Sequence, residues 1–161
     1  EPGDGERFEG RGYLQLVGRL NYRKYSAAAG VDLEADPDQA ERPEVAAAVL
    51  AAFFAERADR ILPAIQRKDY RTVRRLVSGG LHAHRDIVRR LPAYEKALKA
   101  RPRAGRPLRV AGVQDAAWLT LHVPQILKAL DAAGLRELAL RAYILASAEH
   151  ESGQGRWMRQ L

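Results

Sequence analysis

An apolar stripe that follows Pro43 constrains the fold of this chain more than any other feature. Pro43 suits the first turn of a helix, and apolar residues then recur at three- and four-residue spacing through an alanine-rich segment to about Ala58. These residues are Val45, Val49, Leu50, Phe53 and Phe54. A stripe this wide belongs in a protein core, so we expect a mainly α fold built around this helix.

Further segments continue the helical pattern on both sides of this stripe. The expected helices run from Leu20 to Ala29, around Ile61 to Ile65, and from Asp69 to Val77, 84 to 99, Val113 to His122, Pro124 to Ala133 and Leu135 to Glu151. One short run, Tyr13 to Val17, alternates among glycine-rich turns and predicts a small strand or β-hairpin. Residues 99–112 hold charge, proline and glycine without a sustained period, which is typical of a linker.

Composition limits the class of protein. The 161 residues fit one domain, and the absence of cysteine means that no disulfide contributes to the fold. No apolar run is long enough for a membrane span and no signal-peptide pattern opens the chain, so we expect a soluble protein without membrane insertion. A formal charge of +7 favours polyanionic partners, among them the bacterial envelope. Nucleic acid is the rival partner, but the arginine-rich middle has no reader motif and no aromatic platform, so we expect none.

Two segments at opposite ends of the chain carry motifs. Residues 1–22 contain Gly-Asp-Gly, then Gly-Arg-Gly-Tyr-Leu-Gln-Leu, then Gly-Arg-Leu-Asn-Tyr. Residues 148–157 read Ala-Glu-His-Glu-Ser-Gly-Gln-Gly-Arg-Trp. Together these segments resemble glycoside hydrolase family 19, the group of chitinases and of many phage and bacterial endolysins. In that family the His-Glu-Ser-Gly segment comes first, whereas here the order is reversed.

The resemblance implies a lysozyme-like helical domain with a small β-hairpin next to the active-site cleft. Residues 1–98 resemble the later part of the family domain and residues 113–161 its beginning, so we expect one circularly permuted domain, 1–161, joined through the linker at 99–112. A fragment that spans two copies of a tandem array is the alternative. The implied enzyme is a monomer that needs no cofactor and inverts the configuration of the sugar.

The general acid that the resemblance assigns is Glu151. This residue ends an apolar helix, where partial desolvation and the negative end of the helix dipole favour a protonated carboxyl group. Such a carboxyl group can protonate the oxygen that leaves the sugar. The alternative is an ordinary glutamate in a last helical turn.

The second carboxylate is less well defined by the sequence. Glu1 and Asp4 lie in the glycine-rich segment and are the candidate bases, although Asp4 can equally brace its own turn. Downstream of Glu151 no Asp or Glu follows, and the amides Gln154 and Gln160 can hold water but cannot take its proton. Val17 occupies a position where the family has Ser or Thr, a hydroxyl that helps to hold the attacking water.

The resemblance also suggests substrate-binding residues, namely Gln15, Asn21, Tyr13, Trp157 and Arg11. Amide side chains match the donors and acceptors of N-acetyl sugars, and aromatic rings can stack on sugar faces. Local bracing of the turn is the alternative for Gln15, Asn21 and Arg11. We expect no metal site, because His82 and His84 lack a plausible third ligand.

The sequence therefore predicts an endolysin-like glycosidase that cleaves β-1,4 bonds of peptidoglycan. A catalytically weakened domain that binds cell-wall glycan, or a chitinase acting on chitin oligomers, is the alternative function. A phage-type lysin is made in the cytoplasm and acts at the bacterial cell wall; a secreted protein is the other possibility.

Overall fold

The computed structural model describes residues 1–100 and 106–155. Its helices, in chain order, are α1 (Asp4–Arg7), α2 (Arg19–Ala29), η1 (Pro37–Glu41), α3 (Pro43–Gln66), α4 (Tyr70–Ser78), α5 (His84–Lys99), η2 (Trp118–His122), α6 (Val123–Ala132) and α7 (Leu138–Glu151). The expectation of a mainly α fold is confirmed for the described part of the chain.

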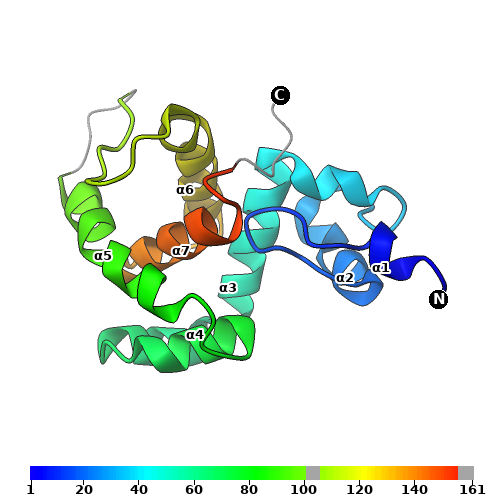
Figure 1. Ribbon diagram of the computed structural model, residues 1–161, viewed down its shortest axis with the longest axis horizontal. Coiled ribbons are helices and arrows are strands. Elements are labelled where there is room, and N and C mark those ends of the chain that lie inside the picture. The colour runs from blue at the N-terminus through cyan, green and yellow to red at the C-terminus, as the bar shows by residue number, and fades with distance from the viewer. Residues whose placement is uncertain (101–105, 156–161) are drawn as a thin grey trace.

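The long helix α3 stands between the two halves of the molecule. Helices α1, α2 and η1 lie on one side of it, and α5, α6 and α7 lie on the other (Figure 1). Pro43 occupies its first turn, as the sequence predicts, and Pro63 lies inside the helix without ending it. Because α3 packs against both halves, buried residues from Phe8 to Ala148 form one continuous core.

Helix α7 is buried on nearly all sides. Helix α5 packs along it, and α3 and α6 cover further parts of its surface (Figure 1). Nine of the ten positions from Leu140 to Glu149 are buried, and Arg141 is the exception. A helix that is apolar all round belongs in the interior, so its last residues are held by the core.

The glycine-rich segment forms a closed turn instead of the expected β-hairpin. A single antiparallel bridge joins Arg11 and Leu16, and no strand is present in the ranges that the structure describes. Gly12 and Gln15 both have positive φ angles, of 78° and 54°. These left-handed residues turn the chain back within four positions, which leaves no length for a paired ladder.

The expected linker is partly structured. Helix α5 ends at Lys99, residues 101–105 lie outside the described chain, and Leu108 and Val110 are buried in the core. The expected helix from Val113 is replaced by an extended segment and the π-helical turn η2, which leads directly into α6. Trp118, in η2, is fully buried, so this return segment is anchored to the core.

Candidate active site

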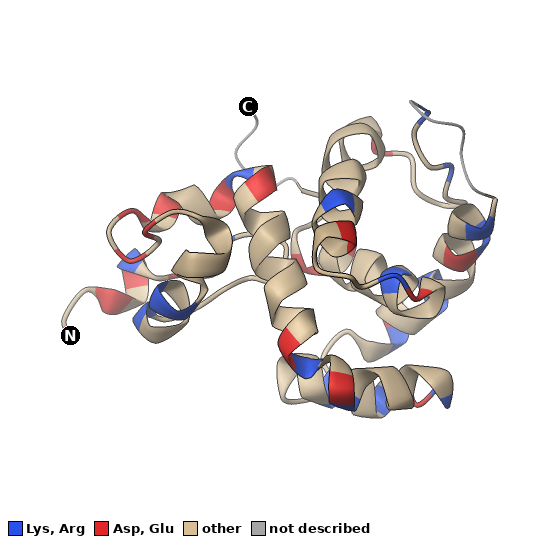
Figure 2. Cartoon of the chain, turned by 180° about the vertical axis from the view of Figure 1, so that it is seen from behind, with Lys and Arg blue, Asp and Glu red and all other residues tan. Residues whose placement is uncertain are grey.

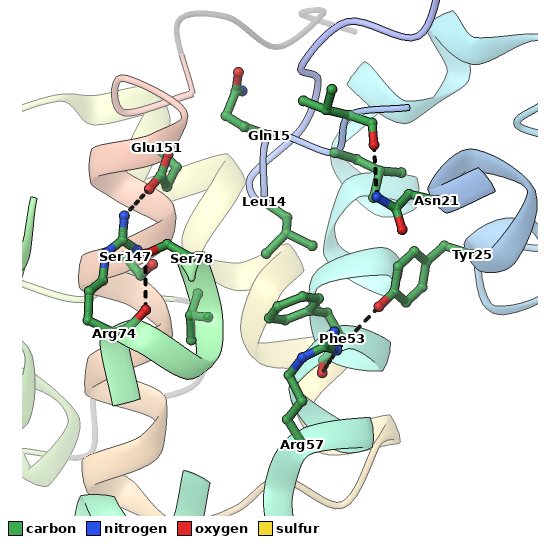
Figure 3. Close-up of a pocket in the computed structure, with 13 residues that line it drawn as sticks. Leu14, Gln15, Asn21, Tyr25, Phe53, Arg57, Arg74, Ser78, Ser147 and Glu151 are labelled. Carbon is green, nitrogen blue, oxygen red and sulfur yellow. Dashed lines mark hydrogen bonds and ion pairs between the residues drawn. The ribbon is translucent and has the colours of Figure 1, made fainter. Parts of the chain in front are cut away.

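The two motif-bearing segments line one cleft. Its volume is about 340 Å³, and its walls come from the glycine-rich segment, α2, α3, α4 and α7 (Figure 3). The lining residues are Leu14, Gln15, Leu16, Val17, Asn21, Tyr25, Phe53, Arg57, Arg74, Val77, Ser78, Ser147 and Glu151. Segments that are more than 120 positions apart in the chain thus face the same space.

Glu151 presents its carboxylate to this cleft from the last turn of α7. Its side chain is 25% exposed, and Oε1 lies 2.6 Å from Nη2 of Arg74 (Figure 3). Arg74 is itself buried, and its Nε donates to the carbonyl oxygen of His82 at 2.6 Å. Because the Arg74 guanidinium is anchored on His82, it holds the Glu151 carboxylate in one orientation. The carboxylate stays partly accessible from the cleft.

Two amide side chains line the same cleft, Gln15 from the glycine-rich segment and Asn21 from the first turn of α2. Nε2 of Gln15 donates to the carbonyl oxygen of Gly12 at 2.9 Å, and Nδ2 of Asn21 donates to that of Val17 at 2.8 Å. Each amide is therefore braced by its own turn, as one of the two interpretations of the sequence expected. Bracing through the amide nitrogen leaves the amide oxygen able to accept a hydrogen bond from a sugar.

A basic and aromatic wall completes the cleft. The guanidinium of Arg57 lies 3.7 Å from the centroid of the Phe53 ring and donates to the hydroxyl of Tyr25 at 3.4 Å. Neither Arg57 nor Arg74 was expected at the site from the sequence. Arg74 carried a usable signal, because a buried helix stripe that includes an arginine between Val73 and Val77 requires a partner for its charge.

The two candidate bases are not among the residues that line the cleft. Asp4 accepts two hydrogen bonds from Arg19, at 2.6 Å and 3.0 Å, and Glu1 lies 3.1 Å from the same guanidinium. The hydrogen bonds from Arg19 lower the pKa of Asp4 to about 2. Both carboxylates thus belong to a partly exposed ion-pair cluster at the outer end of α2.

Tyr13 and Arg11 lie in the core and not on the cleft wall. The Tyr13 hydroxyl is 2.5 Å from Nδ1 of His122, and burial raises its pKa. Arg11 donates to the Tyr22 hydroxyl at 3.0 Å and lies 3.2 Å from Asp38, which matches the anchoring role considered for it. Trp157 lies outside the described residues.

His122 connects the two motif-bearing segments beneath the cleft. Its ring contacts Tyr13 on one side, and on the other it packs so closely on Gly155 that a Cβ there would lie 2.4 Å from the ring. Only glycine fits at position 155. The turn after Glu151 and the glycine-rich segment are therefore held against the same buried ring.

A second carboxylate, Glu149, lies behind the cleft in a buried polar network. Arg90 and the hydroxyl of Tyr94 both donate to it, and Nε1 of Trp118 donates to the Tyr94 hydroxyl at 2.8 Å. Nε2 of Gln154 also donates to Glu149, at 3.2 Å. The network joins α5, α7 and η2 to the turn that follows Glu151.

The described residues contain no group of three His, Asp or Glu side chains placed to hold a metal ion. Within the same ranges, no helix has the length and apolar character that crossing a membrane requires. Comparison of the chain with family models, with curated proteins and with solved structures found no match.

Proposed function

We propose that this protein is an endolysin-like glycoside hydrolase that cleaves β-1,4 bonds of bacterial peptidoglycan, with Glu151 as the proton donor. The observation that carries the proposal is the shared cleft. Glu151 faces it from α7, and Gln15 and Asn21 face it from the segment that resembles the Gly-Arg-Gly part of family 19. Residues with these expected roles meet although they come from opposite ends of the chain.

Each cleft residue has a chemical task in this proposal. Glu151 delivers a proton to the glycosidic oxygen as the bond breaks, and Arg74 keeps the carboxyl group directed into the cleft. The amide oxygens of Gln15 and Asn21 accept hydrogen bonds from the hydroxyl and N-acetyl groups of the sugar. No cofactor takes part, and the wall of the bacterial cell is the place of action.

The reversed order of the two segments fits a circular permutation of a lysozyme-like domain. In support, the cleft is formed within a single chain, whereas a fragment of a tandem array would need a second molecule to complete it. The burial of Leu108 and Val110 further supports a joining segment that packs on the core. Domains tolerate such permutations when the joined ends lie near each other at the surface.

Replacement of the acid is the direct test. We expect Glu151→Gln to lower the release of muropeptides from purified peptidoglycan at least about a hundredfold, because a general acid contributes a factor of that size. Glu137→Gln makes the same chemical change at the exposed start of α7 and should leave activity within about twofold of the parent. Equal activity of Glu151→Gln and the parent would remove Glu151 from the mechanism.

A glycan-binding domain that does not cut is the second candidate function. The lining of the cleft favours it. Among the described residues that line the cleft, Glu151 is the only one with a carboxylate. Val17, which is 57% exposed, offers no hydroxyl. An inverting enzyme needs a second carboxylate about 6.5 to 9.5 Å from the first. Binding of the parent to insoluble peptidoglycan without release of reducing ends would support this candidate, and cleavage of chitin oligomers alone would support a chitinase.

A further inference from the structure

Three exposed arginines gather where α4 and α5 meet. Arg71 and Arg75 belong to α4, Arg85 to the first turn of α5, and all three surround the imidazole of His84; we call this group the arginine corner. Lys and Arg predominate along both helices, with Asp86 and Glu95 as the acidic residues of α5 (Figure 2). The arginine corner is therefore a local concentration of positive charge.

A cavity of about 400 Å³ opens at the arginine corner. It is lined by Arg71, Leu81, Ala83, His84, Arg85 and Asp86. Its one carboxylate is already engaged, because Asp86 lies 3.0 Å from Nη2 of Arg89. Within the described chain, Arg71 and Arg85 form no ion pair, whereas the charge of Arg75 also acts on Asp69, whose pKa it lowers.

The imidazole of His84 is exposed to the positive charge of the arginine corner. Its Nδ1 is buried and has no hydrogen-bond partner in the described chain. Burial lowers the pKa of His84, and the guanidinium groups of Arg71, Arg74, Arg75 and Arg85 lower it further. A buried ring nitrogen without a partner is costly, and an anion beside it would relieve both the missing hydrogen bond and the repulsion.

Helix α4 contributes residues to both the arginine corner and the cleft. Arg71 lies one helical turn before Arg74, and residues three apart on a helix are neighbours, with Cβ atoms about 5 to 6 Å apart. Arg74 lines the cleft and also holds the carbonyl oxygen of His82, in the loop that leads to α5. The ring of His82 in turn packs against that of His150, next to Glu151.

We propose that the arginine corner is a second binding site, which takes phosphate groups of an anionic polymer attached to the glycan that occupies the cleft. Planar guanidinium groups recognise phosphate oxygens in pairs, and two of them, from Arg71 and Arg85, line one cavity. Because α4 contributes residues to both the cleft and this cavity, a glycan bound in the cleft can direct a phosphodiester branch toward the arginine corner. The choice of a wall polymer over other phosphate polymers rests on the proposed function.

Binding of phosphate is tested first with inorganic polyphosphate as the probe. The His84 ring is followed by NMR, and polyphosphate should raise its pKa toward the ordinary value because phosphate offsets the guanidinium charge. Arg71→Gln combined with Arg85→Gln should weaken binding at least about tenfold and lower the slope of log affinity against log salt by about 2. Arg60→Gln combined with Arg136→Gln removes the same charge from exposed positions elsewhere. Equal losses in the two double variants would show that only net charge matters and would overturn the site.

The source of the phosphate is tested with the Glu151→Gln protein, which removes cleavage from the measurement. It should bind cell walls that carry phosphodiester polymer at least about tenfold more tightly than walls from which the polymer has been extracted, and the arginine corner double variant should lose this difference. Equal binding to both walls, or tighter binding to double-stranded DNA at the same salt concentration, would overturn the wall polymer as ligand. Both experiments measure binding, so their results remain valid if the protein does not cleave glycan.

Discussion

Two groups of carboxylates in this protein have opposite surroundings. Glu1 and Asp4, near the start of the chain, share the partly exposed guanidinium of Arg19. Glu149 and Glu151 lie at the end of α7. Glu149 belongs to a buried network, and Glu151 faces the cleft. The residue types are the same, but only the second group is held by the core. Rigid support by an interior helix is what makes a carboxylate at the end of α7 suitable for chemistry.

Removal of Glu149 should have the largest effect on stability. Glu149→Ala leaves Arg90 and the hydroxyl of Tyr94 without their acceptor inside the core, so we expect the free energy of unfolding to fall by about 3 kcal/mol. Urea denaturation measures this loss. Glu149→Gln keeps an acceptor oxygen and should cost clearly less.

The matched change near the start of the chain is Asp4→Asn. Its carboxylate belongs to a solvated cluster, and solvated ion pairs contribute little to stability. We therefore expect no measurable change in the urea midpoint. A loss as large as that of Glu149→Ala would remove the difference between the two groups of carboxylates.

The hydroxyl of Tyr13 tests the connection between the two motif-bearing segments. Burial lowers the pKa of His122, and a neutral ring that carries its proton on Nε2 can accept a hydrogen bond from the Tyr13 hydroxyl at Nδ1. Tyr13→Phe removes this donor and should lower the free energy of unfolding by about 1 kcal/mol. Tyr70→Phe is the control, since the Tyr70 hydroxyl makes no hydrogen bond within the described chain and its ring stacks on Tyr143. If Tyr13→Phe and Tyr70→Phe lower the free energy of unfolding equally, the hydrogen bond between Tyr13 and His122 does not support the cleft.

The helices could be predicted from the sequence where local signals agreed. Gly30 and Gly79 end α2 and α4 with positive φ angles of 71° and 77°, and the apolar period located α5 and the start of α3. The end of α3 was not located, because the helix continues past Ala58 and through Pro63 to Gln66. The run from Tyr13 to Val17 misled because it forms a closed turn, in which Tyr13 and Leu16 are buried and Val17 is exposed. A two-residue alternation over five positions does not separate these possibilities.

The cleft could be predicted only in part. The meeting of Gln15, Asn21 and Glu151 was expected from the motifs, whereas the network around Glu149 could not have been found. Its partner Arg90 is 59 positions away, and no pattern in a single sequence pairs a glutamate with an arginine at that distance. Likewise, the pairing of Asp4 with Arg19 depends on how the glycine-rich segment folds back on α2.

A weak dependence of stability on pH is also expected from the solvated ion-pair cluster near the start of the chain. Hydrogen bonds from Arg19 lower the pKa of Asp4 to about 2, and hydrogen bonds from Arg23 lower that of Glu34 to about 2, from ordinary values of 3.8 and 4.5. A carboxyl group whose pKa is lowered in the folded state stabilises the fold at pH values above its pKa in the unfolded state. This contribution is lost as the pH falls toward 2. NMR titration of the carboxyl carbons should give midpoints near 2, and Arg19→Gln should return that of Asp4 toward 3.8. A midpoint of Asp4 that is already near 3.8 in the parent would show that Arg19 does not hold this carboxylate in solution, and Asp4 would again be available as a base.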